Sequence, residues 1–271
     1  MGMVNYNLAQ NMENDRGSRR FEDELVELSS IKDVNYERVA EFKQLLGTHV
    51  NTENFLKARG FMRQGKLTIV GLLLFSDNIS VYLPSALIRF TRYEGTKETS
   101  GARLNVVKDV TFDKALPTAI REAKAFIKTQ LRDYTFLGKE GKFVTLVEYP
   151  EFAWFEGMIN AIIHRKYENI GDHIRIKMFD DRLEIISPGA FPDAISLANI
   201  RDERYSRNPK LAASIRLNKG DRESKNGVER IYSVMKENFM NEPIYSEPYH
   251  NSVCLTLRNN IKERKLRKIL P

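Results

Sequence analysis

Two short segments in which apolar and charged residues alternate constrain the fold of this chain more than any other feature. Across His173–Phe179 apolar side chains alternate with basic ones, and a similar alternation continues across Arg182–Ile186. Successive side chains of a β-strand point to opposite faces, so each segment has the pattern of a strand with one buried face. Only Asp180 and Asp181 separate the two segments, which is the spacing of a β-hairpin. The sequence therefore predicts a sheet with antiparallel strands.

Periodicity elsewhere predicts further elements around this hairpin. Apolar residues recur at helical spacing in 116–132, 151–166 and 228–239, and strand patterns cover 86–93, 143–147, 244–247 and 252–257. The apolar run Ile69–Phe75 fits a buried strand or a buried helix equally well. Together these segments predict an α+β fold, in which a largely antiparallel sheet between about residues 80 and 260 carries the three helices on one face.

The remaining segments divide the chain into regions. Residues 1–20 are polar and without periodicity, as in a flexible leader, and residues 21–65 have the short patterns of a helical extension or linker. Residues 66–260 contain the sheet domain with the region that precedes it, and residues 261–271 form a basic tail. We expect this tail to be solvated or to be the exposed face of a helix, with nonspecific contact to a nucleic-acid backbone as the alternative.

Composition limits the classes of function. Apolar residues make up 42% of the chain and charged residues 29%, as in ordinary globular proteins, and the net charge of +7 permits a polyanionic partner without requiring one. The single cysteine, Cys254, excludes an internal disulfide, and no apolar run is long enough to cross a membrane. We expect a cytoplasmic protein without a membrane partner. The phosphate-binding loop of helicase motors, GxxxxGK[ST], does not occur in the sequence.

A polar stripe on the segment after Pro150 is the strongest candidate for a functional site. Glu156, Asn160 and His164 lie four residues apart, and each such step advances only about 40° beyond a full helical turn. An asparagine oxygen suits Mg²⁺, and a carboxylate one turn away can activate a water molecule. Gly157 suggests that something approaches this face closely. We expect the stripe to line a cavity closed by the loop 190–226; the alternative is an ordinary solvated helix face.

At these residues the chain resembles one bacterial and archaeal family. The resemblance is carried by EGMINAIIHRKY (156–167), IRIKMFDDRLEIISPGAFP (174–192), SRNPKLA (206–212) and ESKNGVERI (223–231), and it extends upstream through NFLKARGFMRQGKLTIVGLLLF (54–75). The family comprises transcriptional regulators often labelled RecG-like ATP-dependent helicases. They combine a Schlafen or divergent AlbA-type domain with a C-terminal domain similar to the GHKL ATPases. The AlbA-type domain is missing here, so we expect a fragment or a truncated member. The implied fold of the sheet domain is the GHKL, or Bergerat-like, sandwich.

This resemblance implies bound ATP and Mg²⁺, and it assigns a role to individual residues. Glu156 matches the general base of the GHKL fold and Asn160 matches its magnesium ligand. The remaining positions implied to contact the nucleotide are His164, Arg165, Ser187, Gly189, Arg207, Lys225 and Gly227.

Three departures from the family pattern predict weak or absent ATP hydrolysis. Ser187 replaces the aspartate that accepts a hydrogen bond from adenine, Lys225 replaces the first glycine of a Gly-x-Gly turn, and Lys166 replaces an acid. The expected function is a nucleotide-binding regulatory module of a transcriptional regulator. The alternative is a degenerate, non-catalytic scaffold of a DNA-binding regulator. Expected partners are a nucleotide, DNA through domains absent from this chain, and a second copy in a homodimer.

Overall fold

A six-stranded sheet forms the centre of the computed structural model, which describes residues 20–138, 141–192, 194–203, 205–219 and 227–269. The strand order is β4-β3-β7-β8-β10-β9. The bounds are β3 (Ile88–Tyr93), β4 (Val106–Phe112), β7 (Ile174–Met178), β8 (Arg182–Pro188), β9 (Ile244–Ser246) and β10 (Ser252–Arg258). Neighbouring strands are antiparallel except β3 and β7, which are parallel. The predicted α+β fold with a mostly antiparallel sheet is confirmed.

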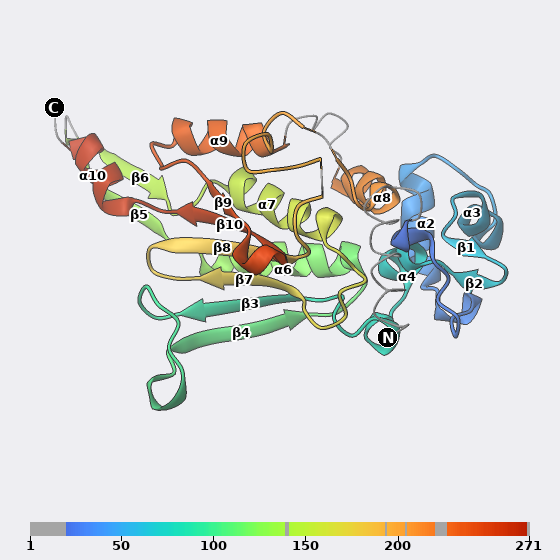
Figure 1. Ribbon diagram of the computed structural model, residues 1–271. Helices are drawn as coiled ribbons and strands as arrows, with labels where there is room; N and C mark the ends of the chain where they lie inside the picture. The colour runs from blue at the N-terminus through green and yellow to red at the C-terminus, as the bar shows by residue number, and fades with distance from the viewer. Residues whose placement is uncertain (1–19, 139–140, 193, 204, 220–226, 270–271) are drawn as a thin grey trace.

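Three helices cover one face of this sheet: α6 (Leu116–Gln130), α7 (Glu151–His164) and α9 (Gly227–Glu237) (Figure 1). One row of paired residues, which share a face, crosses the sheet: Phe90, Ile176, Ile185, Leu255 and Tyr245. The ring of Phe126 in α6 contacts Phe90, Gly157 in α7 lies against the row at its centre, and Tyr232 in α9 stacks on Tyr245. The helices therefore pack on the same side, as their single apolar stripes predict.

A second, mainly helical unit precedes the sheet and lies at one end of it (Figure 1). It comprises η1 (Phe21–Asp23), η2 (Ile31–Asp33), α2 (Tyr36–Leu45), α3 (Thr52–Ala58), the short pair β1 (Met62–Arg63) and β2 (Lys66–Leu67), α4 (Ile69–Phe75) and α5 (Ile79–Tyr82). The rings of Phe42, Phe55, Phe61 and Phe75 form its aromatic core. The apolar run 69–75 is thus a helix, and every residue of it is buried.

At the other end of the sheet, a hairpin and the last helix pack together. The hairpin consists of β5 (Asp133–Leu137) and β6 (Phe143–Val147), and the helix is α10 (Ile261–Ile269). Buried Arg264 of α10 donates hydrogen bonds to the backbone oxygens of Val147, Glu148, Asn238 and Asn259. The segment expected to be a basic tail is therefore a docked helix as far as residue 269.

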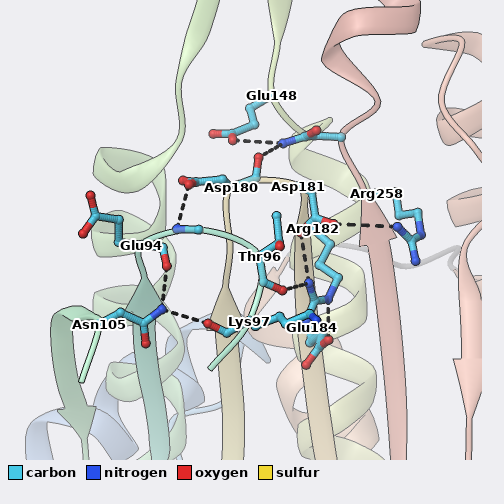
Figure 2. Close-up of polar contacts among 12 residues, drawn as sticks. Glu94, Thr96, Lys97, Asn105, Glu148, Asp180, Asp181, Arg182, Glu184 and Arg258 are labelled. Carbon is cyan, nitrogen blue, oxygen red and sulfur yellow. Dashed lines mark hydrogen bonds and ion pairs between the residues drawn. The ribbon is translucent and has the colours of Figure 1, made fainter. Parts of the chain in front are cut away.

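The turn of the β7–β8 hairpin is fixed by polar contacts, which Figure 2 shows. Asp180 Oδ2 accepts from the Gly95 backbone nitrogen at 2.8 Å, and Arg182 Nη1 donates to the Thr96 oxygen at 2.7 Å. The side chain of Asn259 donates to the backbone oxygen of Asp180 at 2.8 Å. These bonds hold the turn end of β8, and the opposite end of that strand leads into the candidate site. No helix in the described part of the chain is long and apolar enough to cross a bilayer.

Candidate functional site

A cavity of about 140 Å³ lies between α7, the sheet and the loop that follows β8. Apolar side chains of the sheet and the loop, among them Ile185, Leu255, Ile195 and Ile200, make up much of its wall. A cavity of roughly 150 Å³ in an engineered lysozyme accommodates benzene. The enclosed part therefore has the size to hold one flat aromatic ring system, with any larger ligand extending outward.

The loop over the cavity begins with a sharp change of chain direction at Gly189. Its φ of +106° lies in a region that side-chain-bearing residues rarely adopt, and a Cβ there would come within 2.6 Å of Lys166 Cβ and 2.8 Å of Arg207 Nη1. Farther along, Arg201 forms a bidentate ion pair with Glu229 of α9, with distances of 2.6 and 3.0 Å. The described part of the loop is thereby tied to α9 above the cavity.

Two residues of the predicted polar stripe, Asn160 and His164, line the cavity. The Asn160 Nδ2 atom is buried and has no hydrogen-bond partner. Burial, with additional repulsion from Arg207 and Arg216, lowers the pKa of His164 to about 4. The imidazole is therefore neutral near pH 7 and offers a ligand hydrogen bonds but no charge.

Glu156, the third residue of the stripe, does not line the cavity. It is 1% exposed and lies beneath the first residue of α9, so that a Cβ on Gly227 would overlap its Oε1 atom. Helix α9 begins directly against the carboxylate, so a larger residue at position 227 would require the Glu156 side chain to shift. Gly227 thus belongs to the cover over Glu156.

Ser187 lies at the end of β8 and lines the cavity. Its hydroxyl donates to the backbone oxygen of Ala161 at 2.7 Å, so the hydrogen is committed and the oxygen lone pairs remain as acceptors. An acceptor here suits a ligand N–H group.

The arginines and Lys225 have separate environments. Arg207 lines the cavity while donating to the backbone oxygens of His164 and Ala190, both at 3.0 Å. Arg165 is buried outside the cavity wall, where it donates to Ser85 Oγ and the Asp172 oxygen. The structure thus gives Arg165 a role in fixing the turn after α7. Lys225 lies outside the described residues.

The glycine within α7 marks a close approach to the helix, as the sequence predicts. A Cβ on Gly157 would come within 2.6 Å of Leu255 Cδ2 and 3.1 Å of Ile185 Cδ1. What approaches this face closely is therefore the sheet, and the glycine allows α7 to lie near it. Sequence reasoning also missed Tyr205 and Tyr245, which line the cavity. The strand pattern around 244–247 and the helix at 228–239 were both predicted, but spacing within the chain does not show that the two bring Tyr245 to the cavity wall.

The second half of the sheet domain is similar in sequence to a known protein family. Residues 171–257 match the family model HATPase_c_4, described as "Putative ATP-dependent DNA helicase recG C-terminal". This segment runs from β7 to β10 and includes Ser187, Gly189 and Arg207. The chain is thus similar over this region to a RecG-like ATPase-type domain, which favours nucleotide binding.

Among solved structures, the chain is similar to the DIP2311 protein from Corynebacterium diphtheriae, with a TM-score of 0.67 and 23% sequence identity. The likeness covers 85% of this chain and 46% of that one, so the chain spans about half the length of that protein. At this identity the likeness shows the fold alone. No curated protein matches the chain.

Proposed function

We propose that the cavity binds ATP, with the base in its enclosed part and the phosphates toward the start of α9. Asn160 carries the proposal, because its amide has a buried, unpartnered nitrogen at the wall of a cavity of suitable size. Buried polar atoms of this kind are costly unless something satisfies them. Ser187 supplies an acceptor for the adenine amino group, and the similarity of residues 171–257 to an ATPase-type domain favours the same ligand class.

Magnesium fits the site only together with the nucleotide. The described residues contain no group of three His, Cys, Asp or Glu side chains that could hold a metal. Mg²⁺ commonly takes one or two protein ligands and fills its coordination with phosphate oxygens and water. Asn160 Oδ1 would be the protein ligand, and the ion would neutralise phosphate charge.

We further propose that turnover is weak or absent and that the chain acts as a nucleotide-binding regulatory module of a transcriptional regulator. A general base must lie within hydrogen-bond reach of the attacking water, or one water away. Glu156 is instead covered by Gly227 and is absent from the cavity wall. Ser187 also lacks the charge of the aspartate it replaces. Loss of one well-placed electrostatic contact can cost roughly 10²–10³ in rate.

Binding is tested by the thermal unfolding midpoint with and without Mg-ATP. Saturation at about 100 times the dissociation constant adds about 2.7 kcal/mol of stability, a readily measured shift. Asn160→Ala is expected to abolish that shift. Asn54→Ala, the same substitution on an exposed position of α3, is the matched control. Absence of a shift in the unmodified chain at millimolar ATP would refute the proposal and favour the non-catalytic scaffold.

Hydrolysis is tested separately by phosphate release from the unmodified chain and from Glu156→Ala. A flat baseline in both, with binding retained, supports a sensor rather than an enzyme. Robust release that disappears in Glu156→Ala would show that Glu156 reaches the nucleotide in another conformation of the chain.

A further inference from the structure

One tyrosine at the cavity has no role in the function proposed above. The Tyr245 hydroxyl oxygen is buried and has no hydrogen-bond partner, and its side chain lines the cavity together with Asn160. A buried hydroxyl that loses its bonds to water without gaining a partner is destabilising. Two such atoms at one cavity mark a place where a ligand, or water in its absence, satisfies both.

The position of the tyrosine follows from its strand and the helix above it. Tyr245 is paired with Leu255 in the row of residues that faces the helices. Its ring stacks on Tyr232 of α9, with the centroids 6.5 Å apart and the planes at 20°. The guanidinium of Arg201, the residue that ties the loop to α9, lies over the ring of Tyr232, 4.5 Å from its centroid. The ring of Tyr245 is thus held between sheet and helix, and few alternative orientations are open to its hydroxyl.

The surroundings also determine which end of a ligand the hydroxyl would meet. Val228, in the first turn of α9, lines the same cavity as Tyr245, Asn160 and Ser187, and the Ser187 hydroxyl is bonded to the backbone oxygen of Ala161. Burial, with smaller electrostatic contributions from Tyr232 and Glu156, raises the pKa of Tyr245, so the hydroxyl is a protonated donor at neutral pH. The backbone N–H groups at the N-terminus of α9, where Val228 lies, suit anionic oxygens, so we expect the phosphate side of the ligand there.

We propose that Tyr245 is a nucleotide-binding residue whose hydroxyl, beside the Asn160 amide, donates a hydrogen bond to an oxygen on the phosphate side of the ligand. This inference rests on the proposed function, since it assigns a further contact within the same site. It predicts that Tyr245 discriminates nucleotides from nucleosides. Ser187, at the other end, contacts the base and does not discriminate them.

The test compares Tyr245→Phe with Tyr232→Phe, each of which removes one hydroxyl and leaves the stacked rings in place. Isothermal titration with ATP, ADP and adenosine, each in the presence of Mg²⁺, gives the affinities. For Tyr245→Phe we expect affinities for ATP and ADP to fall roughly tenfold or more, the effect of losing a hydrogen bond to a charged group, with adenosine changed by less than about twofold. Tyr232→Phe is expected to bind all three like the unmodified chain.

The unfolding midpoint without ligand separates a binding role from a structural one. Because the hydroxyl has no partner, Tyr245→Phe should be as stable as the unmodified chain or more stable. A clear loss of stability would mean that the hydroxyl is satisfied within the fold, and would overturn the inference. Unchanged ATP affinity, or an equal loss for adenosine, would overturn it while leaving the proposed function intact. If the unmodified chain binds none of the three compounds, the proposed function itself fails.

Discussion

Replacing Glu22 tests how the N-terminal unit is joined to the helix that follows the cavity loop. The carboxylate of Glu22 in η1 is 1% exposed and accepts hydrogen bonds from the backbone nitrogens of Lys210 and Leu211, both at 3.0 Å. These nitrogens belong to the first turn of α8 (Pro209–Lys219), whose N–H groups have no partner within the helix. Glu22 thus caps a helix that lies almost 190 residues farther along the chain.

The expected cost of Glu22→Ala follows from these two bonds. Each backbone donor left buried without a partner costs about 1–3 kcal/mol, so two donors cost about 2–6 kcal/mol. Relief from burying the carboxylate offsets part of this, since burial raises the pKa of Glu22 against the two hydrogen bonds and Lys210, which lower it. We therefore expect a net loss of about 2–4 kcal/mol in the free energy of unfolding. Glu22→Gln keeps one acceptor and should lose roughly half as much.

Urea unfolding followed by Trp154 fluorescence and by circular dichroism measures this loss. Trp154 is the single tryptophan and is fully buried in α7. Asp23→Asn is the matched control, because it removes only the partly exposed ion pair with Lys210, and such pairs contribute about 0–1 kcal/mol. An equal loss in both variants, or full stability of Glu22→Ala, would refute the capping role.

Three further predictions concern the cavity. The pKa of His164 is about 4 in the folded chain and about 6.5 in the unfolded one, so on acidification the unfolded state takes up a proton first. As the pH is lowered from 6.5 to 4, the free energy of unfolding should therefore fall by up to about 1.4 kcal/mol per pH unit. Urea titrations at several pH values should show a shallower fall for His164→Gln; identical slopes would contradict the assignment. Gly189→Ala should lower the unfolding midpoint more than Gly47→Ala, since both residues have positive φ but only Gly189 has atoms within 4 Å of a new Cβ. Arg201→Gln should leave the midpoint unchanged and speed nucleotide release in stopped-flow experiments, because it frees the loop from Glu229; unchanged release would exclude this ion pair as the loop's tether.

The elements that were predictable are those whose side chains divide between core and solvent. The β7–β8 hairpin alternates strictly, and the structure places its turn at Asp180–Asp181 as predicted. Helices α6, α7 and α9 likewise match their predicted segments within a few residues. In the hairpin, α6 and α9, only one face is buried, so the sequence shows a single clear periodicity. Helix α7 is more deeply buried than these elements.

The elements that escaped prediction lack this division. Strand β4 lies at the edge of the sheet with most of its residues exposed, so 106–112 shows no alternation and was not expected to be a strand. Strand β5 was also missed; it lies in a two-stranded hairpin, and its side chains are exposed or only partly buried. For helix α4 the obstacle is the opposite one. Every residue of this segment is buried, so no polar positions distinguish a helical period from that of a strand. Arg264 and Glu22 are charged residues that become buried through contacts distant in sequence, which local patterns cannot anticipate.

The candidate site shows what spacing does and does not determine. The i, i+4, i+8 spacing places Glu156, Asn160 and His164 on one stripe, and two of them line the cavity. Spacing cannot reveal that α9 crosses the stripe at its first residue, because that depends on where Gly227 packs. The consequence is chemical. The residue expected to act as base lies under the first residue of α9, while the amide one turn away lies at the wall of the cavity. For the proposed function, Glu156 could meet the nucleotide only after a rearrangement at the start of α9, whereas the proposed binding at Asn160 needs no such rearrangement. The arrangement therefore supports the proposal of a protein that holds a nucleotide rather than consuming it.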